Sequence, residues 1–238
     1  MRRFVVLLAS AAVLLTAGCG AKSYEDRLNK TLAQRRYVKR LDENLMPAPA
    51  ESKLKQYQVF VRPPKAMEGP TKAFQLAPPE EGKFDLAESF VDPGKSSLHV
   101  LARVKQPKSA DAKKAAPPPT NRGDFNVDVA ALLGSVYNLE IDLAAAKEET
   151  VRKNKFKRVT FEGNGKNVLV YLVGSKSSTH EVALIFEYPK SETSKLVPMI
   201  DLALGAFAVG PLAQRAYDGA VGDEAEEGAG EGEAAVAF

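Results

Sequence analysis

Segment 168–173 constrains the fold more than any other part of the chain, because it is apolar on both faces of the strand that it predicts. Val168, Val170 and Leu172 alternate with Leu169, Tyr171 and Val173. An antiparallel strand of this composition has to be covered on both sides. The sequence therefore predicts a sheet that lies between two other layers.

The neighbouring segments place this strand in an antiparallel meander. Asn164-Gly165 is a strong hairpin signal, because both central residues of a type I′ turn need a positive φ. The turn joins a strand at 156–162 to the apolar strand, and a Ser-rich turn at 175–178 leads to a third strand at 181–188. Three consecutive strands of one sheet are thus predicted.

The N-terminal half of the body contributes further strands. Residues 57–62 have strand character and stop at Pro63-Pro64, and residues 98–104 alternate clearly between apolar and polar positions. Residues 84–91 fit either a strand or a short helix. Because Pro and Gly are frequent at 63–82, we expect mostly irregular structure there.

Two helices are expected to cover the sheet. The first begins at a capping Asp124 and has an apolar face of Phe125, Val129, Leu132, Leu133 and Val136. The second begins near Ser194 and is expected to end at Gly210-Pro211. Between the first helix and the meander, residues 139–154 are ambiguous: Leu139, Ile141 and Leu143 alternate, but the sequence then turns Ala- and Glu-rich, which suggests helix.

This order of elements resembles the Mog1/PsbP-like α/β/α sandwich over residues 57–210. The resemblance implies a fold and a tendency towards accessory or binding roles, and it transfers no functional residue. The predicted fold class is α+β: a three-layer α/β/α sandwich with a mostly antiparallel sheet, preceded by an N-terminal helix and followed by a disordered acidic tail.

The N-terminus has the layout of a secretory signal. The positive pair Arg2-Arg3 precedes an apolar run of about 12 residues, and Ala17 and Gly18 lie just before Cys19. As a helix this run spans roughly 18 Å, too short for a hydrocarbon core of roughly 30 Å. With the cysteine at the cleavage position, the segment resembles the lipobox of bacterial lipoproteins, although Thr16 stands where Leu is most frequent.

The lipobox resemblance implies that residues 1–18 are removed and that Cys19 is the lipidation site, with a diacylglyceryl group on its thiol and an acyl chain such as palmitate on the new amino terminus. The alternative is an ordinary secretory signal that happens to contain a cysteine. Gly20 rather than Asp follows Cys19, which slightly favours the outer membrane over the inner. We expect a cell-envelope protein that is lipid-anchored and faces the periplasm.

Residues 19–50 are predicted to form a lipidated arm with a basic helix at 22–45. Its apolar residues form a loose stripe: Tyr24, Leu28, Leu32, Val38, Leu41 and Leu45. Its candidates for contact with a membrane surface or a partner are six cations: Arg27, Lys30, Arg35, Arg36, Lys39 and Arg40. A solvated stalk or a packed arm is the alternative, which we favour because Arg35, Asp42 and Glu43 interrupt a membrane-lying face.

An α+β domain is expected over residues 51–217, with an exposed Pro- and Lys-rich insertion at 106–121. Residues 218–238 contain seven acids and no Lys or Arg, so the net charge of +3 combines a basic body with an acidic tail. A basic body suits an anionic lipid or polymer surface, or a tail that folds back on it. A tail that only keeps the protein soluble is the simpler interpretation.

The sequence shows no recognisable catalytic or metal-binding motif. Cys19 is the only cysteine, so no thiol remains for disulfides, catalysis or metal sites once it is lipidated. His99 lies on one predicted strand and His180 just before another, and a shared site, which would need adjacent strands, is not expected. Segment 163–166 lacks the spacing of a phosphate-binding loop and is predicted as a hairpin turn.

The charge of the chain and its predicted location limit the classes of partner that we expect. The basic insertion contains no aromatic side chains for base stacking, so nucleic acid is not expected as a partner. No cofactor is expected either. The remaining partners are the membrane, through lipidated Cys19, and an envelope protein or cell-wall polymer.

We predict a lipid-anchored envelope protein with a non-catalytic binding or accessory function, and not an enzyme. The alternative is a lipid-anchored periplasmic enzyme whose site is assembled from scattered residues. A cleft in which carboxylates or both histidines converge with strongly perturbed pKa values would favour the enzyme. A flat charged or apolar patch would favour the binding module.

Overall fold

The structure, a computed structural model, describes residues 24–74, 79–105, 122–174 and 178–219. The predicted signal peptide, Cys19, the insertion at 106–121 and the tail from residue 220 onward lie outside the described residues. By its internal contacts the chain divides into two compact units, residues 1–40 and 41–238. A helix covers residues 24–44. Among the described helices, none combines the length and apolar character that crossing a bilayer requires.

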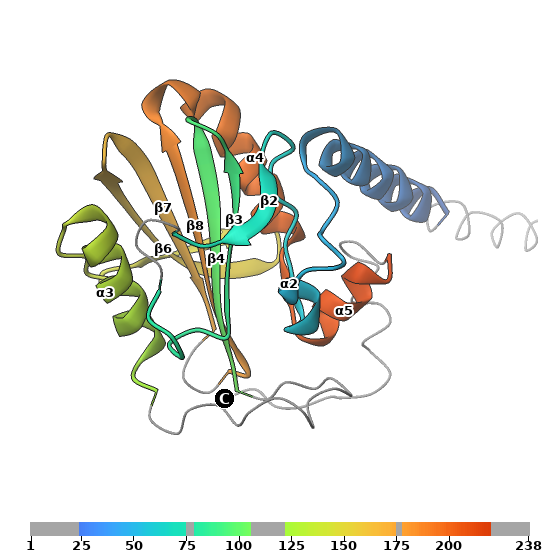
Figure 1. The fold of residues 1–238 in the computed structure, drawn as a ribbon. Coiled ribbons are helices and arrows are strands. Elements are labelled where there is room, and N and C mark those ends of the chain that lie inside the picture. Colours follow the sequence, from blue (N-terminus) through green and yellow to red (C-terminus); the bar gives the residue numbers. More distant parts are fainter. Residues whose placement is uncertain (1–23, 75–78, 106–121, 175–177, 220–238) are drawn as a thin grey trace, which may run out of the picture. The chain divides into compact units, whose positions relative to one another are not determined.

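The second unit is built around a seven-stranded sheet with the strand order β2-β3-β4-β8-β7-β6-β5 (Figure 1). All neighbouring strands are antiparallel. The strand bounds are β2 Glu68–Lys72, β3 Leu86–Asp92, β4 Ser96–Val104, β5 Lys147–Val151, β6 Asn154–Gly163, β7 Lys166–Val173 and β8 His180–Pro189.

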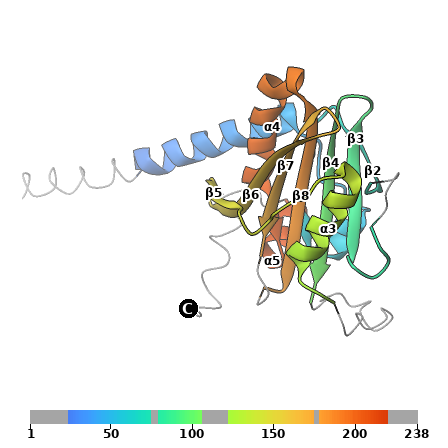
Figure 2. The ribbon, with the colours of Figure 1, turned by 90° about the vertical axis from the view of Figure 1, so that its left-hand side faces the viewer.

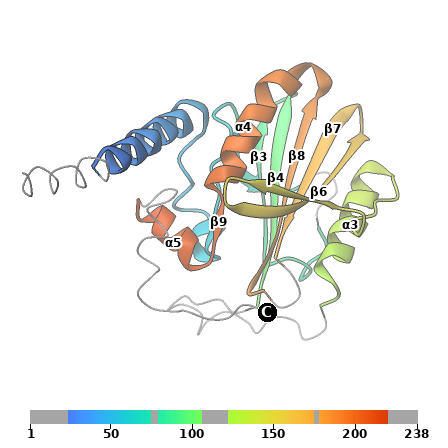
Figure 3. The ribbon, with the colours of Figure 1, turned by 180° about the vertical axis from the view of Figure 1, so that it is seen from behind.

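Helices cover both faces of this sheet. Helix α3, Phe125–Tyr137, lies on one face and α4, Thr193–Ala206, on the other (Figures 2 and 3). Under α3, Val129 and Leu133 belong to one buried apolar cluster with Val170 of β7. The α4 face is closed by buried side chains from both layers: Leu169, Tyr171, Leu184, Phe186, Ile200 and Leu204. The predicted three-layer α+β sandwich is therefore confirmed.

Local signals in the sequence explain how these elements begin and turn. Asn164 and Gly165 have φ values of 52° and 74° and join β6 to β7, as a type I′ turn requires. At the start of α3, Asp124 accepts hydrogen bonds from the backbone N–H groups of Asn126 and Val127 at 2.9 and 3.4 Å. The predicted hairpin and helix cap are both confirmed.

Two predictions about the sheet edges were wrong. Residues 147–151 form edge strand β5 rather than helix, and residues 68–72 form edge strand β2 within the segment that was expected to be irregular. Both strands have only one neighbour, and β2 is exposed at every position. Edge strands of this kind need no alternation of apolar and polar residues, so the sequence pattern of these segments did not indicate strands. The ambiguous segment 84–91 is mostly strand β3.

The C-terminal end of the domain also differs from the expectation. Helix α4 ends at Ala206 rather than at Gly210-Pro211, because residues Ala208–Val209 form strand β9, which pairs with β1, Val59–Phe60. Pro211 then opens the short helix α5, Pro211–Tyr217, since a proline fits the first position of a helix. A short α2, Lys53–Gln56, and a 3₁₀ turn η2, Lys190–Glu192, complete the described elements.

Candidate functional site

A cleft of about 630 Å³ lies beside the C-terminal end of α3. Helix α3 ends at Tyr137, where Asn138 takes a left-handed conformation with a φ of 53°. Leu101 of β4 lies under the helix, whereas His99 and Ser97, on the same face two and four residues earlier, line the cleft. The cleft thus occupies the part of this sheet face that lies past the end of α3.

The walls of the cleft come from parts of the chain that are far apart in sequence. Its floor is formed by His99 of β4 and Glu187 of β8. One wall contains Glu68, Thr71 and Phe74; a second contains Val91, Pro93 and Ser97; the third contains Val136, Tyr137, Asn164 and Lys166. Polar side chains lie in every wall, but most of the surface that lines the cleft is apolar, as is usual for small-molecule sites.

The Glu187 carboxylate is the centre of the polar groups. Its Oε1 atom lies 3.2 Å from Nε2 of His99 and accepts a hydrogen bond from the Tyr137 hydroxyl. Its Oε2 atom lies 3.5 Å from Nζ of Lys166. His99 and Tyr137 are each 6% exposed. A nearly buried carboxylate is thus held by three donors from β4, α3 and β7.

These contacts determine the charge states of Glu187 and Tyr137. Burial alone would raise the pKa of Glu187, but the hydrogen bond and charge of His99, the hydrogen bond from Tyr137 and the charge of Lys166 lower it to about 2. Burial, and then the neighbouring Glu187 charge, raises the pKa of the Tyr137 hydroxyl well above its ordinary value of 10. Around neutral pH the carboxylate therefore stays ionised and the phenol stays protonated.

This assignment predicts how Glu187 contributes to stability at different pH values. Because its pKa of about 2 in the folded chain lies below the ordinary 4.5, the contribution is present above about pH 4.5 and is lost as the pH falls towards 2. Glu187→Gln should lower the free energy of unfolding by about 1.5–3 kcal/mol at pH 7. Urea denaturation should show that the difference from the wild type shrinks between pH 5 and pH 3.

Glu162→Gln is the matched control, since Glu162 is exposed and pairs with Lys190 on the surface. Its difference from the wild type should stay below about 1 kcal/mol at every pH. A Glu187→Gln difference that stays constant from pH 7 to pH 3 would contradict the lowered pKa.

The His99 ring is buried against Phe74 and Glu187. Phe74 stacks on it with a centroid separation of 3.9 Å and an interplanar angle of 17°. Nε2 faces Glu187, while Nδ1 is buried and has no hydrogen-bond partner among the described residues. Neither ring nitrogen is therefore presented to a molecule in the cleft.

Gly163 explains how Tyr137 reaches this position. A Cβ atom at residue 163 would lie 2.5 Å from Cδ1 of the Tyr137 ring, closer than any side chain tolerates. The missing side chain lets the tyrosine ring pack against the end of β6, where Phe161 also meets it edge-on. Replacement of Gly163 by a larger residue would therefore displace one wall of the cleft.

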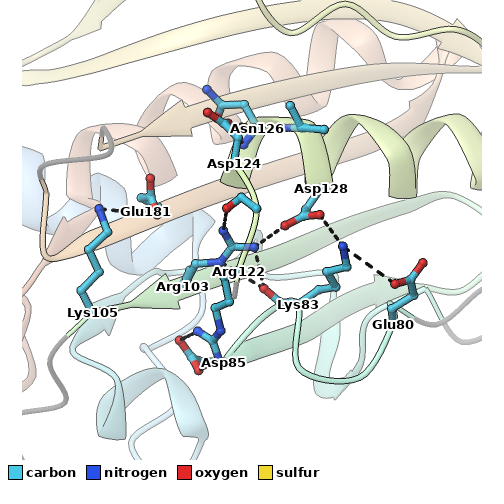
Figure 4. Close-up of polar contacts among 12 residues, drawn as sticks. Glu80, Lys83, Asp85, Arg103, Lys105, Arg122, Asp124, Asn126, Asp128 and Glu181 are labelled. Carbon is cyan, nitrogen blue, oxygen red and sulfur yellow. Dashed lines mark hydrogen bonds and ion pairs between the residues drawn. The ribbon is translucent and has the colours of Figure 1, made fainter. Parts of the chain in front are cut away.

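A second polar cluster lies at the opposite, N-terminal end of α3 (Figure 4). Buried Arg103 donates to Asp128 of α3 and to the backbone carbonyls of Lys83 and Gly123. Lys83 donates to the other Asp128 oxygen at 2.8 Å. Burial would raise the pKa of Asp128, yet the hydrogen bonds from Lys83 and Arg103 outweigh it and hold this pKa below its ordinary value.

The same cluster fixes both ends of the insertion. Arg122 binds Asp85 through two hydrogen bonds of 2.7 Å, and Asp85 also accepts from the backbone N–H of Val104 at 2.8 Å. Arg103 and Val104 thus precede segment 106–121, and Arg122 and Gly123 follow it. Because these charged groups pair with each other and with backbone, and only Nε of Arg122 is buried without a hydrogen-bond partner in the described part of this cluster, we assign the cluster a structural role.

The structure also places the predicted site residues. The six cations of the basic helix, Arg27 to Arg40, are all exposed, and so are Tyr24, Leu28 and Leu32. Their role in membrane or partner contact stays a prediction.

The two histidines lie on neighbouring strands but do not share a site. Strand β4 pairs with β8, so the strands are adjacent. His180, however, pairs with Val104, five residues along β4 from His99, and alternation places it on the opposite face. Its Nε2 donates to the Tyr57 carbonyl, its Nδ1 is hydrogen-bonded to the Thr179 hydroxyl, and burial lowers its pKa. Within the described part of the chain, no cluster of three His, Cys, Asp or Glu residues could hold a metal ion.

Sequence reasoning missed the cleft residues Glu187, Tyr137 and Lys166. The only available signal was register: Glu187 and His99 occupy inward-facing positions of strands whose other inward positions are Ile185 and Leu101. A charged residue at such a position needs buried partners.

Comparisons with known proteins show a distant similarity to solved structures. No family model matches the sequence, and no curated protein matches it. Among solved structures, the chain is similar to the solution structure of cyanobacterial PsbP (CyanoP) from Synechocystis sp. PCC 6803. The TM-score is 0.42 at 8% identity, over 70% of this chain and 93% of that chain. This neighbour is of the PsbP-like kind that the element order resembles, and a similarity of this size assigns no residue a role.

Proposed function

We propose that this protein is a lipid-anchored accessory protein of the cell envelope, and that its sandwich domain binds a ligand in the cleft beside α3. One observation carries the proposal. The cleft has the size and the mostly apolar lining of a ligand site, while the polar groups on its floor are locked in hydrogen bonds with one another.

The enzyme alternative rests on His99 and Glu187, which meet in a cleft where the pKa of Glu187 is strongly lowered. A general acid or base works best with a pKa near the operating pH. The pKa of Glu187 is about 2 and that of Tyr137 is raised above 10, so both are moved away from neutrality. Since both nitrogens of His99 are buried as well, binding is favoured over proton transfer.

The location is proposed from the sequence. Cleavage before Cys19 and acylation of that cysteine would hold the domain at the membrane on the periplasmic side, with the outer membrane slightly favoured. The basic helix that follows would then act as a stalk or a packed arm. Its exposed cations remain candidates for contact with lipid headgroups or with an envelope partner.

A photo-crosslinking residue at the rim of the cleft tests the binding role. Pro93 lines the cleft and is exposed in the turn between β3 and β4, so p-benzoyl-phenylalanine fits there without disturbing the core. In cells that carry the full chain, ultraviolet light should produce an adduct with the bound ligand, which mass spectrometry of the purified protein would detect.

Glu148 is the matched control position, because it is exposed on β5 at the far edge of the sheet. It should give no specific adduct. Equal yields at both positions, or no adduct at Pro93, would count against a ligand in the cleft.

A further inference from the structure

On the Tyr137 wall of the cleft, Lys166 is the charged side chain with donors left over, whereas Asn164 beside it is neutral and donates to the Val136 carbonyl at 3.4 Å. His99 and the Tyr137 hydroxyl both point their polar atoms at Oε1 of Glu187 and are buried. Lys166 holds Oε2 by the longest of the three contacts, 3.5 Å, and its side chain is 34% exposed. An ammonium group has three N–H donors, so a contact with Glu187 leaves two for a ligand.

Glu187 does not depend on Lys166 alone. If the ammonium group turns towards a second anion, His99 and Tyr137 still hold Oε1 of the buried carboxylate. Lys166 can therefore bridge Glu187 and an incoming anion, with little cost to the floor of the cleft. A cation in the ligand would instead have to compete with Lys166 for Oε2.

The other side chains of the cleft indicate that the rest of the ligand is apolar. Phe74, Val91, Pro93 and Val136 line it with apolar surface. The second carboxylate of the lining, Glu68, is exposed on β2, at the opposite side of the sheet order from Lys166 on β7, so an anion paired with Lys166 lies away from it. Each CH₂ group that such surface removes from water adds a constant increment to affinity. A small, fully hydrated anion would gain nothing from these walls.

We propose that the cleft binds an apolar molecule that carries one carboxylate, and that this carboxylate pairs with Lys166. The inference rests on the proposed function and names its ligand class. Two sources share this chemistry: a free fatty acid, and the C-terminal end of a peptide whose last residues are apolar.

Binding of short carboxylates to residues 19–238 with Cys19→Ser tests the inference. This chain contains every described residue and carries no acyl group that could compete for the cleft. Hexanoate, octanoate and decanoate would be titrated and followed by the amide NMR signals of Val91, Ser97 and Lys166. We expect these signals to shift, with affinity rising about fourfold per added CH₂. Octanol and octylamine should bind at least tenfold more weakly than octanoate.

The role of Lys166 is isolated by three variants. Lys166→Gln should weaken octanoate binding about tenfold or more, and Lys166→Arg, which keeps the charge, should stay within about threefold of the wild type. Lys190→Gln removes an exposed lysine that pairs with Glu162, and it should leave binding unchanged. Unchanged melting temperatures would show that the variants remain folded.

Two further arms separate the sources. If the ligand is a peptide end, acetyl-Leu-Leu with a free carboxylate should bind more tightly than its amide. If the ligand is a fatty acid, decanoate should bind more tightly than either peptide.

The inference is overturned if octanol or octylamine binds as tightly as octanoate, or if Lys166→Gln binds octanoate like the wild type. It is also overturned if no carboxylate shifts the cleft signals at concentrations up to about 10 mM, which is roughly the weak end of measurable affinities. None of these results decides the proposed function, because the Pro93 crosslink reports a ligand of any chemistry.

Discussion

Replacing Cys19 by serine should abolish incorporation of radioactive palmitate and leave the chain at the size of the unprocessed precursor. Acylation needs the nucleophilic thiolate of the cysteine, and a serine hydroxyl is far less nucleophilic at neutral pH. Fatty-acid labelling of growing cells, followed by electrophoresis of the precipitated protein, measures both effects. Since Cys19 is the only cysteine in the chain, no other thiol can take its place.

Thr16→Leu is the informative control for this experiment. It restores the residue that is most frequent three places before a lipobox cysteine, and labelling should persist or increase. Labelling that persists in Cys19→Ser would show that the fatty acid is not attached to Cys19. A wild type that is cleaved without being labelled would indicate an ordinary secretory signal. Either result would withdraw the anchoring part of the proposed function.

The sandwich itself could be predicted because its central strands carry strong local signals. Segment 168–173 is apolar on both faces, Asn164-Gly165 fixes a hairpin, and Asp124 caps α3. In each case the local preference and the tertiary structure require the same residue. Agreement across these levels is what lets a short segment report the fold around it.

The edges of the sheet could not be predicted in the same way. Strand β5, with the sequence Lys-Glu-Glu-Thr-Val, is paired on one side only and lies mostly in solvent. Its pairing with β6 determines its conformation, and that contact is invisible to local propensity. The same holds for β9, which exists because it pairs with β1, about 150 residues earlier in the chain.

The cleft was beyond sequence reasoning for a related reason. His99 and Glu187 are 88 residues apart, and Tyr137 and Glu187 are 50 apart. They meet only because β4 and β8 are neighbours and because α3 ends at Tyr137. Neither the strand order nor the end of the helix over the sheet can be read from any one segment.

The cluster at the other end of α3 should make the larger contribution to stability. Arg103 is 4% exposed and its side chain is bound to Asp128 and to two backbone carbonyls. Arg103→Met keeps the apolar length of the side chain but leaves Asp128 with only the partly exposed Lys83 as an ionic partner. Removing one member of a buried ion pair typically costs about 3–5 kcal/mol, and we expect a loss of this size in the free energy of unfolding.

Urea denaturation at pH 7 measures this loss, and two variants show its cause. Lys195→Met removes a surface contact with Glu192 and should cost less than about 1 kcal/mol. The double variant Arg103→Met, Asp128→Leu should recover part of the loss, because the stranded carboxylate is then gone as well. A second outcome is that the loss in the double variant equals the sum of the losses in Arg103→Met and in Asp128→Leu. In that case the stabilising free energy lies in the hydrogen bonds of Arg103 to the Lys83 and Gly123 carbonyls and not in the ion pair. A single-variant loss below about 1 kcal/mol would show that neither contributes, and that the ends of the insertion are held by the Arg122–Asp85 pair alone.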